Sequence, residues 1–529
     1  MKRYRISLYT IFINLEDAEG RYLLIHGYTG AIDQASAKVI SFLRSGKPIM
    51  ESEELPFSKE TLQRLIARGY VTDKSPFEEK DSVKSMAEAF HKRDKMRKNF
   101  LFLVAYDCNF RCPYCFENAI SSNGKGWSKK VFTKSAADKA YEAMLELESN
   151  RKLHANQITL YGGEPLLASN KEVVNYIVEK GISLGYTFSA ITNGYDLEHF
   201  ENLLRPGAIE KLQISIDGER EKHDNRRTHF QTGRSYDKIM ENMILALKLG
   251  VGISVRINTE LNNFEDIKKI RAEFESLGFF SYKKFSVYSA LIHGEDDMNC
   301  NAVMIKKPEP EASLTSLGFN DTDFLNEFDP DQQYINFENE QARFNAPETT
   351  TVSFHDEKPN VQDKIHTINR GKYIQKHFEA IASDPKMEAI SCQDFGIRSK
   401  IKRALDSKGL IDFRSTFCTA QTGMMIFDPY GDLYSCWETV GMDKHKVGSY
   451  RDGVQLDNEE LEHWYGRNIS KTPACSRCKY AFFCGGGCQA HALREGRGYN
   501  SPYCDGYPKT FQKVVGELYK SHVTQEIVK

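Results

Sequence analysis

The chain has 529 residues, a length that predicts about three domains at roughly 150 residues each. Its 71 lysine and arginine residues nearly balance 73 aspartate and glutamate residues, and the net charge of −2 excludes a whole-chain electrostatic surface for nucleic acid or an anionic membrane. No run of about 18 apolar residues occurs, which excludes a membrane-spanning helix. The strand-like alternation after Met1 is unlike a signal peptide, so we expect a cytoplasmic protein with no nucleic-acid or membrane partner.

Residues 1–85 are predicted to form a small winged-helix-like domain. The expected elements are two strands, two helices and a short β-stretch, at residues 5–15, 21–27, 35–45, 58–68 and 70–72. Ser58 is the expected N-cap of the second helix, because a serine hydroxyl can accept a hydrogen bond from the first turn. A charged helical connector is expected over residues 82–98.

Residues 99–294 alternate between apolar, strand-like runs and helical stretches. Six runs are expected to be buried parallel strands, at residues 100–106, 157–161, 187–191, 211–216, 252–257 and 284–291. Helical stretches separate them, for example at residues 135–149, 171–184 and 235–249. Six such units predict an α/β fold with a partial (β/α)6 barrel of the TIM type, because a complete barrel has eight. Chemistry is then expected at the carboxyl ends of the strands.

The remaining chain departs from this alternation. Residues 295–410 are expected to form an insertion or bridging region, with a polar stretch at 309–364 and a helical rhythm over 370–405. Residues 411–529 are loop-rich and hold seven of the twelve cysteines. Such a segment is expected to need metal in order to fold.

Three cysteines, Cys108, Cys112 and Cys115, directly follow the first predicted barrel strand with the spacing C-x3-C-x2-C. Three thiolates on one loop can hold three irons of a [4Fe–4S] cluster and leave the fourth iron open to a small molecule. Half of a zinc site, or a group of reduced structural thiols, is the alternative. Their place at the end of a barrel strand favours a catalytic cluster.

Read in full, Cys108-Asn-Phe-Arg-Cys112-Pro-Tyr-Cys115 resembles the motif of the radical SAM superfamily. The resemblance continues in the GGEP-like Tyr161-Gly-Gly-Glu-Pro and at the ends of the third and fourth strands. It implies that S-adenosylmethionine binds the open iron and is cleaved to a 5′-deoxyadenosyl radical. It assigns cofactor contacts to Tyr114, Gly162, Gly163, Glu164, Thr192, Asn193, Ser215, Asp217 and Arg227.

Among these contacts, Arg227 is expected to pair with the methionine carboxylate of the cofactor, because arginine binds carboxylates through two parallel hydrogen bonds. Its neighbour Arg226 is the competing assignment. Taken singly, a glycine-rich strand end is an ordinary turn, and each polar residue could be a helix cap or a solvated charge.

Seven further cysteines follow a second ordered pattern, C-x12-G-x4-C, then C-x2-C-x5-C-x3-C and a last cysteine. The pattern is similar to the SPASM domain, a C-terminal extension of radical SAM enzymes with two auxiliary iron–sulfur clusters. The resemblance implies an outer cluster held by Cys475, Cys478, Cys484 and Cys504, and an inner cluster held by Cys418, Cys436 and Cys488. The expected total is three [4Fe–4S] clusters; a pair of zinc knuckles is the alternative.

The inner set has only three cysteines, which leaves two possibilities. Either Cys392 supplies the fourth ligand, or the inner cluster is open to a substrate group such as a thiolate. The lone Cys300 is interpreted as a buried thiol.

The resemblance to SPASM enzymes implies a peptide or protein substrate, and two branches compete. One branch cross-links ribosomally made peptides and often binds the leader peptide by strand addition to an N-terminal winged-helix element, which residues 1–85 fit. The other, the anaerobic sulfatase maturases, forms formylglycine and places an aspartate after the second inner-cluster cysteine. That position is Trp437 here, and the following Glu438 is the candidate catalytic base. A packing or dimerisation role for residues 1–85 stays open.

We therefore predict a radical SAM peptide maturase that abstracts hydrogen from a precursor peptide and forms an intramolecular cross-link. A thioether is favoured, and carbon–carbon or carbon–oxygen links are the variants. The alternative enzyme is a formylglycine-forming maturase; the alternative from another class is a non-catalytic iron–sulfur or zinc module. The expected partners are a leader-bearing precursor peptide and an external electron donor similar to flavodoxin or ferredoxin.

Overall fold

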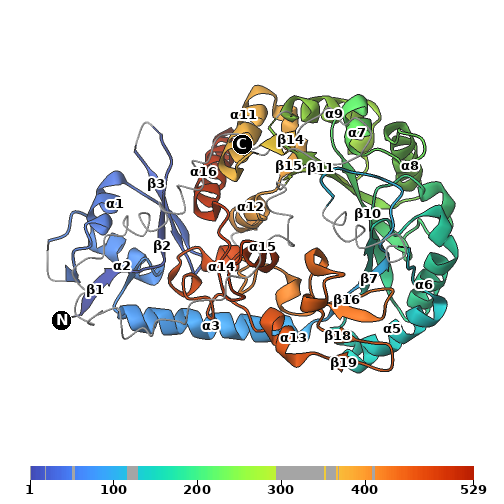
Figure 1. Ribbon diagram of the computed structural model, residues 1–529. Helices are drawn as coiled ribbons and strands as arrows, with labels where there is room; N and C mark the ends of the chain where they lie inside the picture. Colours follow the sequence, from blue (N-terminus) through green and yellow to red (C-terminus); the bar gives the residue numbers. More distant parts are fainter. Residues whose placement is uncertain are drawn as a thin grey trace.

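The computed structural model describes residues 2–17, 20–50, 54–115, 129–261, 263–292, 351–352, 365–366, 368–407 and 411–528. Most of the predicted insertion, and Cys300 with it, lies outside these residues. Figure 1 shows an N-terminal unit on the left and a large curved sheet, lined by helices on its outer side, on the right. Segments rich in cysteine lie between the two.

The N-terminal unit contains two three-stranded antiparallel sheets, with strand orders β5-β1-β6 and β2-β3-β4. Its elements are β1 (Arg3–Ile6), β2 (Thr10–Asn14), β3 (Tyr22–His26), β4 (Ile32–Ala35), α1 (Ala37–Arg44), β5 (Ile49–Met50), α2 (Lys59–Ala67), β6 (Val71–Thr72) and α3 (Pro76–Met96). Both predicted helices are present, and Ser58 caps α2 by accepting a hydrogen bond from the Thr61 amide, as predicted. The strand expected over residues 5–15 is two strands, because a turn at residues 7–9 divides it.

The connector α3 starts earlier than predicted. A capping box formed by Ser75 and Glu78 fixes its start, and Pro76 occupies the first turn, where its missing N–H costs nothing. The helix therefore runs without interruption from the N-terminal unit to the first strand of the large sheet.

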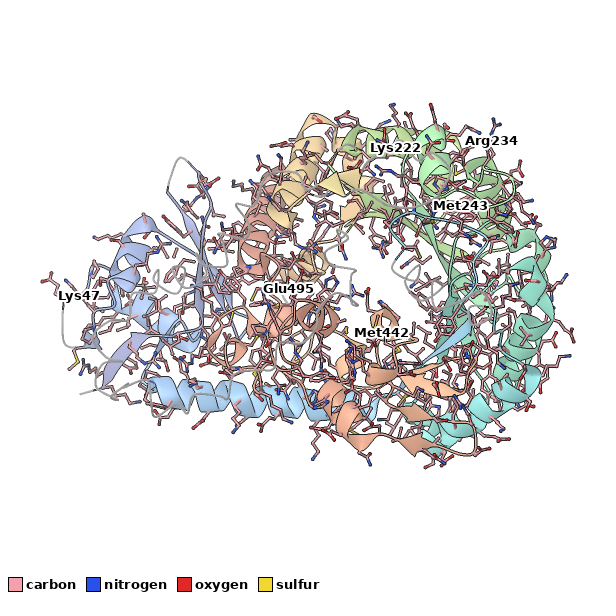
Figure 2. All side chains as sticks on the ribbon, viewed as in Figure 1. Lys47, Lys222, Arg234, Met243, Met442 and Glu495 are labelled. Atoms are coloured by element: carbon pink, nitrogen blue, oxygen red, sulfur yellow. The ribbon has the colours of Figure 1, made fainter. Side chains whose placement is uncertain are left out.

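All six predicted barrel strands are present, and they lie side by side in chain order and in parallel. They are β7 (Asn99–Ala105), β8 (Gln157–Gly162), β9 (Thr187–Thr192), β10 (Ile209–Ile216), β11 (Gly252–Thr259) and β12 (Phe285–Leu291). The helices outside them are α5 (Lys134–Leu147), α6 (Lys171–Ser183), α7 (Arg220–Arg226), α8 (Tyr236–Lys248) and α9 (Phe264–Ser276). Met243 of α8 is fully buried in the layer between helices and strands (Figure 2).

Two parallel strands that the sequence did not predict extend this sheet at its two edges. β15 (Ile390–Cys392) pairs with β12, and β16 (Met424–Phe427) pairs with β7. Antiparallel strands then continue from β16 and bring the sheet to eleven strands: β17 (Asp432–Tyr434), β18 (Gly448–Ser449) and β19 (Gln455–Leu456). The C-terminal part of the chain thus covers the first edge of the barrel.

The other elements are short or lie in the C-terminal half. They are β13 (Thr351–Val352), β14 (Ile365–His366), α11 (Arg370–Ser383), α12 (Ile397–Ser407), α13 (Asn458–Tyr465), α14 (Ala481–Cys484), α15 (Gln489–Arg494) and α16 (Tyr507–Val528). Single turns of 3-10 helix occur at η1 (Arg151–Leu153), η2 (Ala168–Asn170), η3 (Leu197–Phe200), η4 (Phe279–Ser281), η9 (Pro385–Ala389), η10 (Thr419–Gln421), η11 (Trp437–Thr439), η12 (Asp443–His445) and η13 (Cys475–Arg477). Among the helices in the described ranges, none combines the length and apolarity that a bilayer crossing requires.

Candidate functional site

The three cysteines of the first motif lie on the loop that leaves the carboxyl end of β7. The loop is fixed by main-chain hydrogen bonds to the segment after α7: the Arg111 amide donates to Thr228 O (2.9 Å), and the Phe230 amide donates to Asn109 O (2.9 Å). Cys112 is buried, whereas Cys108 and Cys115 are half-buried. The loop is therefore positioned where barrel chemistry was expected.

The thiols of this loop lie close enough to influence one another. Burial, followed by the nearby Glu164 and Cys112, raises the pKa of the Cys108 thiol well above its usual value. Burial also raises the pKa of Cys112, against the opposing effect of Arg227. Because iron binds the thiolate form, a bound cation would compensate the charge that these surroundings disfavour. The donor set fits an iron–sulfur cluster.

Tyr114, between the last two cysteines, belongs to a buried network on the inner side of the barrel. Its hydroxyl donates to Asp217 and accepts from Arg227 Nη1 (3.1 Å) and Asn258 Nδ2 (3.2 Å). Asn258 Nδ2 also donates to Asp217 Oδ1 (2.9 Å). Burial opposes the charged form of Arg227, but Tyr114, Cys112 and Asp217 outweigh it and raise the Arg227 pKa well above its usual value.

The competing assignment, Arg226, has a different role. Its Nη2 atom donates to Glu260 Oε1 (2.6 Å), and both side chains are almost completely buried. Arg226 is therefore neutralised by Glu260, while Arg227 contacts the cysteine loop through Tyr114.

The glycines of the GGEP-like segment are required by a close approach between two strand ends. Gly162 has φ +138°, and a Cβ added there would stand 2.1 Å from the carbonyl oxygen of Ala105, at the end of β7. A Cβ on Gly163 would stand 2.4 Å from Asp107 O. The Gly163 and Glu164 amides donate to Ala105 O and Asp107 O (both 2.9 Å), so this segment is fixed against the start of the cysteine loop.

Glu164 joins the second and third strand ends. It is 1% exposed and accepts hydrogen bonds from the Leu166 amide (2.8 Å), the Thr192 hydroxyl (2.6 Å) and the Asn193 amide (2.6 Å). Burial raises its pKa to about 7, although the three hydrogen bonds oppose that shift. The Asn193 side chain donates to Asn109 Oδ1 (2.7 Å), in the cysteine loop. Glu164, Thr192 and Asn193 thus connect the ends of the second and third strands to the cysteine loop.

The structure adds two asparagines that the sequence reasoning missed. Asn258, the penultimate residue of β11, donates to the Tyr114 hydroxyl (3.2 Å), and Asn263 Nδ2 donates to Asp217 O (3.2 Å) and Asn258 O (2.8 Å). Thr192 and Asn193 were assigned through the family resemblance, and neither Asn258 nor Asn263 belongs to a motif that it covers. Ser215 lies half-buried in β10, two residues before Asp217, and within the described residues its side chain makes no hydrogen bond.

The C-terminal cysteines form two groups. In the first, burial and then Cys488 and Cys418 raise the pKa of Cys436 well above its usual value, so these three thiols are neighbours, as expected for the inner set. In the second, burial followed by Cys478 and Cys484 raises the pKa of Cys475. Cys504 follows Tyr503, whose amide donates to Gly486 O (3.1 Å), two residues from Cys484.

Arg467 lies between the two groups. It is 1% exposed and donates to Gly487 O (3.1 Å), Gly486 O (2.9 Å) and Ser501 O (2.8 Å). Burial lowers its pKa, and the opposing charges are those of Cys475, Cys488, Cys484 and Cys418, which come from both groups.

Within the described part of the chain, no three His, Cys, Asp or Glu side chains converge closely enough to hold a single metal ion. Cluster ligands stand further apart than the ligands of one ion, because each binds a different iron.

Cys392 and Glu438 are in surroundings that bear on their predicted roles. Cys392 ends β15, burial raises its pKa to about 12, and its side chain packs in the hydrophobic cluster that contains Cys475, not in the one that contains Cys436 and Cys488. Glu438 is close to Cys436 and Cys488, and its carboxylate forms an ion pair with Arg494. An ion-paired carboxylate is a weaker base, because its charged form is already stabilised.

Comparison with protein-family models matches residues 102–273 to the radical SAM superfamily. Residues 102–273 form a radical SAM domain. The domain spans β7 to α9, and thus the cysteine loop and most of the network around it. The cofactors of this family are S-adenosylmethionine and a [4Fe–4S] cluster.

Curated relatives match about a third of this chain. GTP 3′,8-cyclase of Campylobacter fetus subsp. fetus is 31% identical over 163 residues, 30% of this chain and 44% of the relative. A cysteine-type anaerobic sulfatase-maturating enzyme of Clostridium novyi is 26% identical over 182 residues, 33% of this chain and 46% of the relative. The chain thus spans less than half of the length of these relatives.

Solved structures align over more of the chain at lower identity. Native anSMEcpe with bound AdoMet aligns with a TM-score of 0.49 at 16% identity, over 81% of this chain and 98% of that one. SuiB of Streptococcus suis aligns with a TM-score of 0.41 at 14% identity, over 94% of this chain and 99% of that one.

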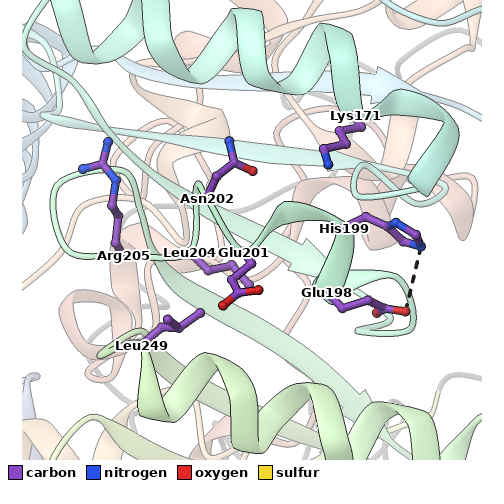
Figure 3. Close-up of a pocket in the computed structure, with 8 residues that line it drawn as sticks. All are labelled: Lys171, Glu198, His199, Glu201, Asn202, Leu204, Arg205 and Leu249. Atoms are coloured by element: carbon purple, nitrogen blue, oxygen red, sulfur yellow. Dashed lines mark ion pairs between the residues drawn. The ribbon is translucent and has the colours of Figure 1, made fainter.

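A shallow hollow of about 760 Å³ lies on the outer side of the radical SAM domain (Figure 3). Its lining residues are Lys171, Glu198, His199, Glu201, Asn202, Leu204, Arg205 and Leu249. The charges are mixed, Glu198 and His199 form an ion pair (3.8 Å), and no predicted site residue lines it. The hollow is separate from the cysteine loop.

Proposed function

We propose that this protein is a radical SAM enzyme that modifies a ribosomally made precursor peptide and forms an intramolecular cross-link in it. A thioether is the favoured bond, and carbon–carbon or carbon–oxygen links are the variants. A leader-bearing peptide is its substrate, and an external flavodoxin- or ferredoxin-like protein supplies electrons.

The observation that carries the proposal is the juxtaposition of the two cysteine regions over the barrel. Trp437, directly after Cys436, is 41% exposed and contacts the Tyr161 ring, with centroids 6.2 Å apart. Tyr161 directly precedes the Gly162–Gly163 turn that packs on the first cysteine loop. A peptide that lies beside this ring contact would be next to both proposed cluster sites.

The chain's own residues have separable tasks in this proposal. Cys108, Cys112 and Cys115 hold the first cluster, which, with S-adenosylmethionine, supplies the 5′-deoxyadenosyl radical chemistry of the family. The carbonyl groups of Gly162 and Gly163 are available to the methionine ammonium group. Thr192, Asn193, Ser215 and Asp217 are assigned to the ribose and methionine ends of the cofactor.

The N-terminal unit is proposed to bind the leader. β4 lies at the edge of the β2-β3-β4 sheet, and an extended peptide can add to such an edge through main-chain hydrogen bonds. The opposite edge strand, β2, contacts α16. Binding the leader on β4 would raise the effective concentration of the core peptide at the barrel.

The proposed bond type depends on the inner cysteine group. Cys418, Cys436 and Cys488 are the three proposed protein ligands, and Cys392 packs in a different hydrophobic cluster from Cys436 and Cys488. This favours an inner cluster with an open iron to which a substrate thiolate binds, and thus a thioether. Ligation by Cys392 would favour a carbon–carbon or carbon–oxygen link.

A formylglycine-forming maturase is the second candidate, because a cysteine-type anaerobic sulfatase-maturating enzyme of Clostridium novyi matches 33% of the chain. The presence of Trp437 after Cys436, and the Arg494 ion pair of the candidate base Glu438, count against it.

The first test is anaerobic. The protein should contain iron and sulfide, and after reduction with dithionite it should produce 5′-deoxyadenosine from S-adenosylmethionine. Replacing Cys108, Cys112 and Cys115 with alanine should abolish this product while roughly two thirds of the iron stays on the C-terminal cysteines. Cleavage that survives in the triple variant would end the radical proposal.

The second test uses peptides encoded by small open reading frames next to the gene. A cross-linked product loses two hydrogens, and fragmentation locates the bond. Conversion of a cysteine to formylglycine in a sulfatase-derived peptide, without a cross-link in any candidate peptide, would favour the second candidate.

A further inference from the structure

The cysteine loop carries a cation on its solvent-exposed side. Arg111 stands between Cys108 and Cys112 and is exposed, and its Nη1 atom donates to the carbonyl oxygens of Cys108 (2.6 Å) and Phe110 (2.7 Å). Within the described residues Arg111 makes no ion pair, and its charge opposes the raised pKa of the Cys112 thiol. Arg111 therefore connects the solvent to the backbone of the proposed cluster site.

An exposed aromatic ring lies beside this guanidinium. The Arg111 Cζ atom is 5.4 Å from the centroid of the Phe230 ring, and Phe230 is 54% exposed. The backbone that carries this ring is fixed, because the Phe230 amide donates to Asn109 O (2.9 Å) and the preceding His229 ring stacks on Tyr195, with centroids 4.2 Å apart. Arginine and aromatic side chains are enriched at the centres of protein interfaces, so this pair is suited to bind a partner protein.

The two segments that form this surface, residues 108–115 and 228–234, contain no aspartate or glutamate. The second segment ends at Arg234, which is exposed at the outer edge of the molecule and makes no ion pair within the described residues (Figure 2). The carboxylates on either side of this segment in the sequence are engaged: Asp224 accepts from the amides at the start of α8, and Asp237 pairs with an arginine of α7. The surface is therefore positive, and it complements a partner with negative charge.

We propose that Arg111, Phe230 and Arg234 form the docking surface for an acidic, flavodoxin-like electron donor. The inference rests on the proposed function, which includes an external donor for the first cluster. Electron tunnelling weakens steeply with distance, and at this surface the central arginine is hydrogen-bonded to the carbonyl of Cys108. A flavin whose apolar edge is surrounded by carboxylates complements an aromatic ring flanked by guanidinium groups. The anionic reduced flavin loses one electron and becomes a neutral radical, the cluster gains that electron, and no proton or bond changes.

The test compares two reductants of the anaerobically reconstituted full-length protein. Dithionite is small and needs no docking surface, whereas reduced flavodoxin must dock, and the readout is the initial rate of 5′-deoxyadenosine formation. Phe230→Ser and Arg234→Glu should lower kcat/KM for flavodoxin roughly 5- to 30-fold, the usual range for an interface hot spot, and change the dithionite-driven rate less than about twofold. Added salt should slow the flavodoxin reaction of the wild type and reduce its advantage over Arg234→Glu.

Arg111→Gln should lower the flavodoxin-driven rate as well. Because this variant also removes hydrogen bonds to the carbonyls of the cysteine loop, a change in its dithionite-driven rate is expected, and the other two variants carry the test. Iron content and melting temperature identify misfolded variants.

Arg205→Glu is the matched control, because Arg205 is an exposed arginine that lines the outer hollow, and it should leave both rates unchanged. Arg477→Glu tests the competing entry point, because Arg477 is an exposed cation within the outer cysteine group. A flavodoxin-specific loss in Arg477→Glu but not in Phe230→Ser or Arg234→Glu would overturn the proposal, as would equal losses with the two reductants. Losses seen with a [2Fe–2S] ferredoxin but not with flavodoxin would overturn the choice of a flavin donor. A wild-type protein that forms no 5′-deoxyadenosine with either reductant would instead contradict the proposed function.

Discussion

Gly162 fixes the distance between the GGEP-like segment and the cysteine loop. It combines a positive φ of +138° with a main-chain contact that leaves no room for a Cβ. Gly185 also has a positive φ, +81°, but a Cβ there would meet nothing within 4 Å. Substitution of the two glycines therefore distinguishes the energetic cost of the backbone conformation from the energetic cost of the steric clash.

Gly162→Ala is expected to lower the free energy of unfolding by about 3 kcal/mol or more, since it adds a steric clash to an unfavourable φ. Gly185→Ala should cost about 1 kcal/mol, from the conformation alone. Urea unfolding of iron-loaded protein measures both. Equal losses in the two variants would show that the approach to Ala105 is not what requires glycine.

Arg467 illustrates a second residue-scale effect, the action of one buried cation on two cysteine groups. A cation stabilises the more negative, reduced state of a nearby cluster. Arg467→Met should therefore shift the midpoint potentials of the two proposed auxiliary clusters to more negative values, and Arg467→Lys should shift them less. Redox titration followed by electron paramagnetic resonance gives the result, with iron content as the control for cluster loss. Unchanged potentials in a fully loaded Met variant would contradict it.

Among individual site residues, those in motifs could be predicted from the sequence and those outside motifs could not. Cys108, Gly162 and Asn193 are in local patterns whose spacing carries the signal. Asn258 belongs to no such pattern, and its significance comes from its hydrogen bonds to Tyr114 and Asp217, which follow other strands of the sheet. Cross-strand neighbours depend on register, which a single sequence does not contain.

At the scale of elements, α3 is anchored in the N-terminal unit by one buried carboxylate. Glu79 Oε1 accepts from the Ser7 hydroxyl (2.6 Å), and Glu79 Oε2 accepts from Arg5 Nη2 (2.7 Å). Ser7 Oγ is 2.9 Å from His26 Nε2, and the Thr29 amide donates to His26 Nδ1 (3.2 Å). Because Nδ1 accepts, the proton is on Nε2, and neutral His26 donates to Ser7.

Burial lowers the pKa of His26 to about 3, whereas an unfolded histidine titrates near 6.5. Below about pH 6.5 the unfolded chain binds a proton at His26, whereas the folded unit keeps His26 neutral. The free energy of unfolding therefore decreases as the pH falls from 6.5 toward 3. Between pH 6.5 and 5.0 the loss should be about 2 kcal/mol. The groups near the imidazole are Ser7, Tyr28 and Tyr70, with Glu79 reached through Ser7.

Amide exchange in β2 and β3 measures this loss locally. In His26→Gln the pH dependence should be smaller by that amount, even though the variant is less stable at every pH. His199→Gln, at an exposed histidine on the outer side of the barrel, should retain the wild-type pH dependence. If His26→Gln also retains the wild-type pH dependence, a titratable group other than His26 is responsible for that dependence.

Strands and helices were predicted correctly where the segment is long and its sequence pattern is local. The six barrel strands are continuous apolar runs between helices of ordinary length, and each was found. β15 and β16 have three and four residues and come from parts of the chain far from their partners β12 and β7. They are strands only because they pair with segments far away in the sequence, and no local sequence pattern predicts that pairing.

At the scale of the whole molecule, the N-terminal unit and the cysteine-rich segment share one hydrophobic core. Tyr9, Ile11 and Ile25 of the N-terminal unit pack in the same cluster as Phe482 and Phe483, which precede Cys484. The Tyr9 hydroxyl donates to Ser476 O (2.9 Å), next to Cys475. In Figure 1 the sheet that contains β2 and β3 lies beside α14 and α16.

A shared core makes the N-terminal sheet depend on the outer cysteine group, because that loop-rich segment is expected to need metal to stay folded. Cys475→Ala with Cys478→Ala should therefore speed amide exchange in residues 475–504 and also in β2 and β3, while α5 and α6 stay protected. The matched double variant, Cys108→Ala with Cys112→Ala, removes the same number of thiols and should leave β2 and β3 protected, because its loop contacts the barrel. Hydrogen–deuterium exchange of the two anaerobically prepared variants decides the matter. Protection of β2 and β3 that is the same in both would show that the N-terminal unit folds independently of the outer cysteine group, and the sheet proposed to bind the leader would then be a separable module.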